Sequence, residues 1–255
     1  QAVSRGLGDV YKRQFYKLID RALDDKLIFI ADPILDPISY GFTDSLVRYF
    51  NLREKYPDIH IMMGLGNITE LTHADTSGIN MIMLGIIEEL KLNHILTTQV
   101  SRHCSTVIRE TDLARRIIHA ASENNLTPKH INDGLLVHHG HKDYAFCSDE
   151  LIEMQGNIKD KNYRIYVNDD GIHLFNKNVY KIFSDPFDFY EHLEVSDDAG
   201  HAFYLGVELA RAQIAHQLQK EYQQDEELSW GCLVDKKVDN KLQSKELGPT
   251  FKKRK

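Results

Sequence analysis

The sequence predicts an α/β protein in which a parallel sheet precedes a small α+β domain. Three apolar runs, 26–31, 59–63 and 94–96, each stop at a polar or glycine-rich segment, and a helical stretch follows each segment. Strand, loop and helix therefore alternate three times with short connections, as in parallel sheets with helical crossovers. Residues 15–127 are too few for a closed eight-unit barrel, which typically needs ~250 residues, so these units form at most part of one.

Length and composition indicate an ordinary globular protein. The 255 residues are 42% hydrophobic and 27% charged, and the formal net charge of -7 argues against generic nucleic-acid binding. The sequence contains no apolar run of the roughly 20 residues that span a bilayer. Cys104, Cys147 and Cys232 lie far apart and predict neither a disulfide framework nor a zinc site. We therefore expect a cytoplasmic protein with no nucleic-acid or membrane partner.

Both ends of the sequence differ from its middle. Residues 1–14 lack an initiator Met and an amphipathic period, and they are typical of translated adapter read-through. We expect them to be an artefactual leader on an N-terminally truncated fragment, the alternative being a native disordered leader. Residues 235–255 are polar, end in a basic run, and predict a disordered tail.

The helices that follow the strands differ in polarity. A helix over 15–24 is expected before the first strand, and one over 43–56 mixes apolar and charged residues before a proline ends it. The helix at 76–92 is almost wholly apolar, so we expect it to be buried on several sides. The helix at 105–124 carries an alternating charged face that includes Glu110.

Beyond Pro128 the pattern changes to that of a small α+β domain, 128–234. The elements expected there are a short strand at 134–137, a short helix at 148–154, strands at 163–167 and 171–175, and a long helix at 198–222. Asp-Gly between the two alternating runs is the strongest local hairpin signal. The long helix has one apolar stripe at helical spacing, made of Phe203, Val207, Ala210, Ile214, Leu218 and Tyr222.

The carboxyl ends of the three strands hold the candidate ligand-binding residues. Asp32 directly follows the first strand. A partly desolvated carboxylate there needs hydrogen-bond donors, and the paired N–H groups of an aminopyrimidinone edge would supply them. Alternatively, Asp32 caps its own Asp-Pro turn.

The second and third loops offer amide side chains. Asn67 follows Gly64 and Gly66, and its side chain can donate and accept at once, which suits a ring nitrogen beside a carbonyl. Its alternative role is that of a turn former. Gln99 is the best candidate in the third loop, whereas Glu70 is a weaker one in the second. The sequence assigns no catalytic residue.

The histidine-rich segment His138–His141 invites a metal interpretation. Adjacent histidines on a strand point to opposite faces, however, and neither a carboxylate nor a cysteine stands at a ligand-like spacing. We therefore predict no metal. Neither of the common phosphate-binding glycine motifs occurs.

Three motifs together carry a resemblance to a known superfamily. Asp32-Pro33, Gly64–Asn67 and Thr97–Gln99 resemble the last three βα units of the pterin-binding barrels. These include dihydropteroate synthases and the folate-binding domains of corrinoid-dependent methyltransferases. The overall likeness is to dihydropteroate synthase-like proteins of tetrahydromethanopterin-linked one-carbon metabolism. Further matching segments are Leu65–Thr72, Arg109–Arg116, His201–Leu209 and Asp225.

The resemblance implies both a fold and a ligand. The fold would be the C-terminal (βα)3 portion of a TIM-type pterin-binding barrel, followed by the α+β domain. The ligand would be a reduced pterin, with Asp32 on its aminopyrimidine edge, Asn67 near the ring nitrogens and Gln99 on the pocket wall. A corrinoid or one-carbon enzyme, or a second copy of the chain, would be the protein partner.

Departures from the family pattern bear on the reaction. The synthases carry Ser-Arg-Lys and Arg-x-His where this chain has Gly64–Asn67 and Thr97–Gln99. Departure of diphosphate needs cations, which these loops do not supply. The interpretations are a pterin-binding, transferase-like protein in biosynthesis or use of a methanopterin- or folate-type cofactor, a pterin-dependent methyltransferase-like domain, or a non-catalytic pterin-binding scaffold subunit. We expect the fragment alone to be inactive.

Overall fold

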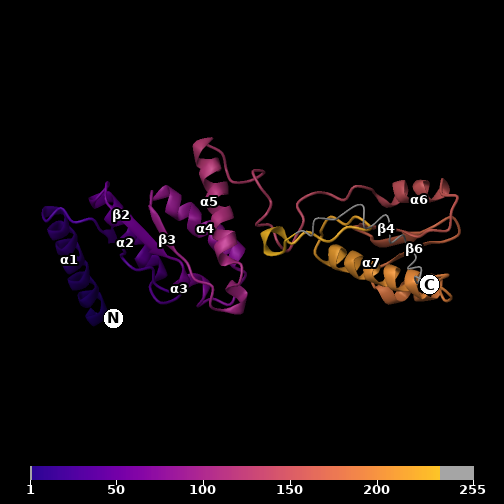
Figure 1. The fold of residues 1–255 in the computed structure, drawn as a ribbon, viewed down its shortest axis with the longest axis horizontal. Coiled ribbons are helices and arrows are strands. Elements are labelled where there is room, and N and C mark those ends of the chain that lie inside the picture. The colour runs from indigo at the N-terminus through magenta and orange to yellow at the C-terminus, as the bar shows by residue number, and fades with distance from the viewer. Residues whose placement is uncertain (1, 236–255) are drawn as a thin grey trace, which may run out of the picture. The chain divides into compact units, whose positions relative to one another are not determined.

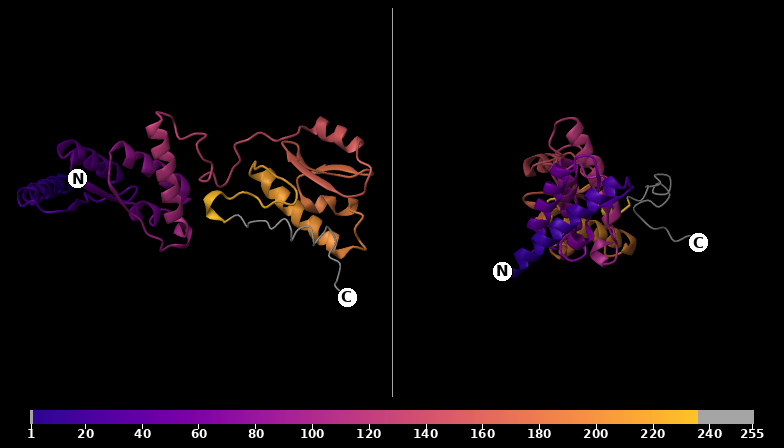
Figure 2. Two further views of the ribbon diagram at one scale, coloured as in Figure 1. Left: turned by 45° about the horizontal axis from the view of Figure 1, so that its top comes forward. Right: turned by 90° about the vertical axis from the view of Figure 1, so that its left-hand side faces the viewer.

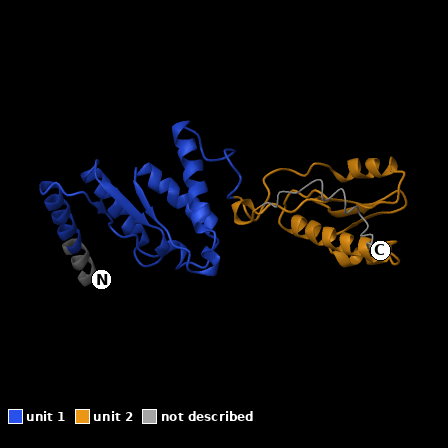
Figure 3. Cartoon of the chain, in the orientation of Figure 1, with its two compact units in different colours: residues 1–135 blue, residues 136–255 orange. Residues whose placement is uncertain are grey.

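The computed structural model describes residues 2–235, with side chains from residue 11, and divides into two compact units. Unit 1 is residues 1–135 and unit 2 is residues 136–255 (Figure 3). The division follows Leu135, whereas the sequence predicted a boundary at Pro128. The predicted tail lies outside the described residues, apart from Asp235.

Unit 1 is an α/β unit with one parallel sheet of three strands in the order β1-β2-β3 (Figure 1). Its elements are α1 (Ala2–Asp24), β1 (Ile30–Ala31), α2 (Phe42–Lys55), β2 (His60–Gly64), α3 (Gly66–Thr69), α4 (Thr76–Glu89), β3 (His94–Leu96), a 3₁₀ helix η1 (Arg102–Cys104) and α5 (Val107–Glu123). The predicted threefold alternation of strand, loop and helix is confirmed. Within residues 2–235 the sheet does not close into a barrel.

Two boundaries near the start of unit 1 were predicted wrongly. Helix α1 begins at Ala2 and not at Phe15, although residues 2–14 have no amphipathic period and include two glycines. The first strand pairs only at Ile30–Ala31. Lys26 has φ 54° and ends the helix, so the residues after it form a connection and not the start of a strand.

The helices of unit 1 pack on one face of the parallel sheet. Ile61 and Met63 of β2 are fully buried in a core shared with α1, α2, α4 and α5. Alternate strand residues point to the opposite face, where Ile30 and Leu96 are 50% and 52% exposed. Parallel sheets are normally covered on both faces, so the second face of this sheet is open within the described chain.

A buried carboxylate joins α4 to α5. Glu110 is 1% exposed and accepts hydrogen bonds from Thr76 Oγ1 at 2.7 Å, Asn80 Nδ2 at 2.9 Å and Thr106 Oγ1 at 2.6 Å. The prediction that Glu110 belongs to a charged surface was therefore wrong, because two of its three donors lie on α4, far away in sequence. The expected burial of α4 holds in part, since Ile82 is exposed.

Arg53 of α2 fixes the amino end of the sheet. Its guanidinium donates hydrogen bonds to carbonyl oxygens in two connections, those of Tyr56, Pro57, Ile59, Leu90 and Lys91, and to Asn93 Oδ1, at 2.7–3.3 Å. These connections run from α2 to β2 and from α4 to β3. Carbonyls at helix ends lack hydrogen-bond donors within the helix, and here one arginine supplies those donors.

Unit 2 is an α+β unit with an antiparallel sheet of three strands in the order β4-β5-β6. Its elements are α6 (Ser148–Gly156), β4 (Arg164–Asn168), β5 (Gly171–Phe175), β6 (Tyr180–Phe183), a 3₁₀ helix η2 (Pro186–His192), α7 (Ala199–Gln217) and a 3₁₀ helix η3 (Gly231–Leu233). Helix α7 packs along β4 and β5 (Figure 2). The short helix and the Asp-Gly hairpin are confirmed, and β6 was not predicted.

The predicted strand at 134–137 does not form. The backbone N–H of Gly134 donates a hydrogen bond to the side chain of Asn132 in a turn. The carbonyl of Val137 accepts one from Lys220 Nζ. These side-chain interactions occupy backbone groups that a sheet would need. Lys220 also donates to Ser229 O and lies over the Trp230 ring, so its ammonium is satisfied although it is buried.

Helix α7 buries a different face from the predicted one. Phe203 of the predicted stripe is 68% exposed, whereas Leu205, Leu209 and Ala212 lie in the core of unit 2. Both stripes have helical spacing, so periodicity alone could not select between them. The helix also ends at Gln217, before the predicted Tyr222.

Replacing Arg53 by Met keeps the apolar stem and removes every donor. We expect R53M to lower the free energy of unfolding of unit 1 by about 2–3 kcal/mol, because several carbonyls lose a charged partner. Chemical denaturation followed separately in unit 1 and unit 2 by hydrogen exchange measures this. An unchanged stability of unit 1 would show that water replaces the guanidinium at no cost.

Candidate functional site at the carboxyl edge of the parallel sheet

The loops that leave the three parallel strands lie at one edge of the sheet in unit 1. β2 and β3 pair in register up to Gly64 and Leu96, and Leu65 N–H donates to Leu96 O at 2.8 Å just beyond. The polar residues of all three loops therefore meet where ligands bind in parallel α/β folds.

Asp32 is held in the first loop through one oxygen. Its Oδ1 accepts from Ile34 N–H at 2.9 Å and from Tyr49 OH at 3.0 Å. The first bond is the turn that the sequence offered as the alternative role of Asp32. Among the described residues Oδ2 has no hydrogen bond, so the same carboxylate can both cap the turn and accept from a ligand.

Tyr49 is a site residue that sequence reasoning missed. It is fully buried in α2, and its hydroxyl also contacts the backbone of Gly64 at the end of β2. Burial, followed by the charge of Asp32, raises the pKa of Tyr49, so the phenol stays protonated and donates to Asp32. Its place on the buried face of α2 beside Leu52 resembled ordinary core packing.

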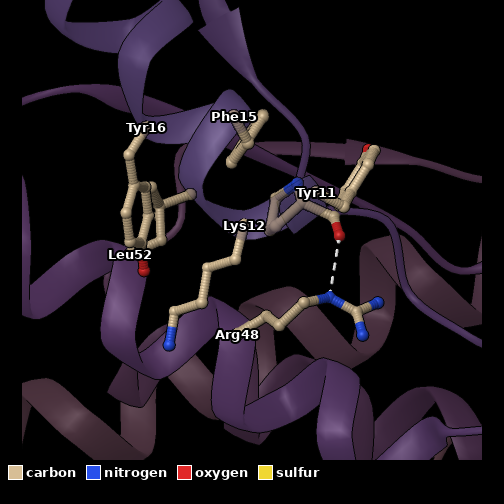
Figure 4. Close-up of a pocket in the computed structure, with 7 residues that line it drawn as sticks. Tyr11, Lys12, Phe15, Tyr16, Arg48 and Leu52 are labelled. Carbon is tan, nitrogen blue, oxygen red and sulfur yellow. Dashed lines mark hydrogen bonds between the residues drawn. The ribbon is translucent and has the colours of Figure 1, made fainter. Parts of the chain in front are cut away.

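Arg48 braces the backbone of the first loop. Its Nε donates to Pro33 O at 3.2 Å (Figure 4), and Nη2 donates to Ile34 O at 2.7 Å and to Asp36 Oδ2 at 2.8 Å. The hollow drawn in Figure 4 is lined by Tyr11, Lys12, Phe15, Tyr16, Pro33, Arg48 and Leu52. None of the three predicted ligand-binding residues lines it.

Asn67 connects the first loop to the second. It lies exposed on α3, and its Nδ2 donates to Leu35 O at 2.7 Å. One N–H of the amide is thus used within the protein, which leaves the second N–H and the amide oxygen for a ligand. Gly66 lies so close to the third loop that a Cβ there would stand 3.0 Å from Thr98 Oγ1, which accounts for glycine at this position.

Glu70 connects the second loop to the third. Its carboxylate accepts from Val100 N–H at 2.8 Å, Ser101 N–H at 2.9 Å and Thr98 Oγ1 at 3.1 Å. These bonds, the one from the Val100 backbone first, lower the pKa of Glu70 to about 2. We assign Glu70 the role of fixing the third loop.

Gln99 and Thr97 complete the third strand end. The Nε2 of Gln99 donates to Ser105 O at 2.6 Å within its own loop, and the side chain is exposed. The Thr97 hydroxyl is buried and has no hydrogen-bond partner among the described residues. Buried polar groups are rarely left unpaired, so the Thr97 hydroxyl is an unsatisfied donor and acceptor at this edge.

The thiol nearest the site is inert. Cys104 is fully buried, and its Sγ donates to Thr69 O at 3.3 Å. Burial raises its pKa to about 11, which leaves almost no thiolate at neutral pH.

The described residues show neither a cluster of three metal ligands nor a membrane-spanning helix. Between residues 11 and 235, no group of three or more His, Cys, Asp or Glu side chains is arranged to hold a metal ion. His139 of the histidine-rich segment instead contacts Leu218 O through Nδ1. No helix in the described part of the chain is both long and apolar enough to cross a membrane.

Fold and site thus define an α/β unit with a polar strand-end site, joined to an α+β unit. The chain is similar to an uncharacterized protein, MJ0107, of Methanocaldococcus jannaschii, with 31% identity over 241 residues. The match covers 83% of this chain and 44% of the relative, so the chain spans less than half of that protein. No family model matches the chain, and no solved structure does.

Removing the Glu70 charge tests the link between the second and third loops. We expect the amides of Val100 and Ser101 to exchange at least about tenfold faster in E70Q than in the wild type, because charge-assisted bonds are lost. In the wild type, the contribution of this carboxylate is present above its unfolded pKa of about 4.3 and is lost as pH falls toward 2. Hydrogen exchange by NMR measures both.

A matched control is Glu89→Gln, which removes an exposed carboxylate of α4. It should leave both amides unchanged. Equal exchange in E70Q and the wild type would contradict the assigned role of Glu70.

Proposed function

We propose that the carboxyl edge of the parallel sheet binds a reduced pterin, and that the chain is part of a pterin-binding protein of one-carbon metabolism. The observation that carries this proposal is the state of Asp32. Tyr49 and Ile34 fix Oδ1, and Oδ2 has no hydrogen bond within the described chain. A pterin presents adjacent N–H donors on its aminopyrimidinone edge, and an oriented carboxylate is a strong acceptor for them.

The rest of the edge supports a ligand that both donates and accepts hydrogen bonds. Asn67 and Gln99 each use one N–H of the amide on a backbone carbonyl, so each keeps its amide oxygen and a second N–H. The Arg48 guanidinium is engaged by two carbonyls and by Asp36. The edge therefore combines a carboxylate oxygen with two amides that both accept and donate, which suits the N–H groups and ring nitrogens of a pterin.

The open face of the sheet supports the barrel part of the proposal. The strands are parallel in the order β1-β2-β3, and the helices lie on one face, as in a (β/α)8 barrel. In this proposal the three units are the C-terminal portion of a TIM-type barrel, and the half-exposed Ile30 and Leu96 face its interior. Further strands would cover them and supply the remainder of the site.

Substitution of Asp32 by Asn tests the ligand directly. We expect the 255-residue chain to bind a tetrahydropterin, and D32N to bind it about ten to a hundred times more weakly, because a charged acceptor becomes a neutral one. Isothermal titration calorimetry measures both affinities. Asp44→Asn, which changes an exposed carboxylate at the start of α2, is the matched control and should bind like the wild type.

Absence of binding by the wild-type chain, or equal binding by D32N, would contradict the proposal. Assays of the full-length protein, which would hold the remainder of the site, then separate the reaction classes. Condensation with a p-aminobenzoate derivative supports a synthase-like transferase, and methyl transfer to a corrinoid protein supports a methyltransferase. Binding without either reaction supports a scaffold subunit.

A further inference from the structure

The amino end of the parallel sheet carries a second polar cluster, at the opposite end of the strands from the candidate pterin site. His60 and His94 are the first residues of β2 and β3. Their ring nitrogens, Nδ1 of His60 and Nε2 of His94, lie 3.0 Å apart and form a hydrogen bond, whose proton a bound metal ion would displace. His94 is the register partner of Met62, and Met62 lies on the same side of β2 as His60. Both imidazoles therefore lie on the open face of the sheet.

We propose that His60 and His94 together bind one divalent transition-metal ion, with Cu²⁺ bound most tightly. This site is independent of the proposed pterin function. The two nitrogens would provide two ligands, and water would fill the other positions.

The distance between the two nitrogens fits a shared ion. Imidazole nitrogens bind such ions at about 2.0–2.1 Å. Two nitrogens on one ion are then about 2.9 Å apart at a right angle and about 3.3 Å apart at the tetrahedral angle. The observed 3.0 Å lies between these values, so one ion can bind both nitrogens with little movement of the rings. Among the divalent first-row ions, a given nitrogen site binds Cu²⁺ most tightly.

The backbone on either side of both histidines is fixed. Arg53 donates to Ile59 O at 3.0 Å, just before His60, and to Asn93 Oδ1 at 3.2 Å, just before His94. Asn93 in turn exchanges two hydrogen bonds with Ile61, through its backbone N–H and its Oδ1. These bonds fix the backbone at both histidines before any ion binds, which reduces the entropic cost of binding.

The surroundings of the pair favour transition metals over Ca²⁺ and Mg²⁺. Both protein ligands are nitrogen atoms, and the register partners of the two histidines are the apolar residues Ile30 and Met62. Ca²⁺ and Mg²⁺ need oxygen ligands, whereas imidazole suits copper, nickel and zinc. His60 is exposed in the described chain, so an ion reaches the site from solvent in this 255-residue chain.

Titration of the metal alone tests the site. We expect the wild-type chain to bind Cu²⁺ at this site with a stoichiometry of one, Ni²⁺ and Zn²⁺ more weakly, and Mg²⁺ not at all. His60→Gln and His94→Gln should each weaken Cu²⁺ binding at least about tenfold, because a single imidazole no longer chelates. Electron paramagnetic resonance of the Cu²⁺ complex should show two coupled nitrogens in the wild type and one in either variant.

The competing histidine-rich segment supplies the control. His141→Gln removes an exposed imidazole of that segment and should leave both affinity and spectrum unchanged. Circular dichroism of each variant verifies that it remains folded. A wild-type chain that binds no Cu²⁺, or a loss of binding in H141Q with none in H60Q and H94Q, would overturn the proposal.

Discussion

The hydrogen bond from the buried Tyr49 hydroxyl to Asp32 connects the core of unit 1 to its candidate site. Tyr49 packs inside the helical layer, so the position of α2 on the sheet determines where the Asp32 carboxylate lies. Asn67 then ties the first loop to the second, and Glu70 ties the second to the third. The three strand ends thus behave as one assembly, and a shift in one loop would break bonds in the next.

The two ends of the parallel sheet differ in chemistry because different side chains are left without protein partners at each end. Alternation along β2 buries Ile61 and Met63 and leaves His60 on the open face. At the amino end, a guanidinium satisfies carbonyls and the side-chain groups that remain are imidazoles. At the carboxyl end, protein N–H and O–H donors hold one side of each loop, and the groups that remain are a carboxylate oxygen and the amides of Asn67 and Gln99. One end is therefore suited to a metal ion and the other to a ligand that carries N–H groups.

Local sequence signals predicted the helices and strands well, but they did not predict the contacts between those elements. The threefold alternation of strands and helices and the Asp-Gly hairpin depend on neighbouring residues, and the structure confirms both. The burial of Glu110 depends on Thr76 and Asn80, which lie on another helix. Helix α7 has two apolar stripes with helical spacing, and the sequence did not show which of them is buried. The sequence placed Asp32 at a strand end, but Tyr49 lies 17 residues away and looked like a core residue. Periodicity cannot identify such pairings.

The most direct measurement is a crystal structure of the chain with a bound dihydropterin. We expect Asp32 Oδ2 to accept from the aminopyrimidinone edge at about 2.8 Å, while Tyr49 still donates to Oδ1. A pterin bound away from the three strand ends, or an Asp32 carboxylate that makes no contact with it, would contradict the proposed pterin site.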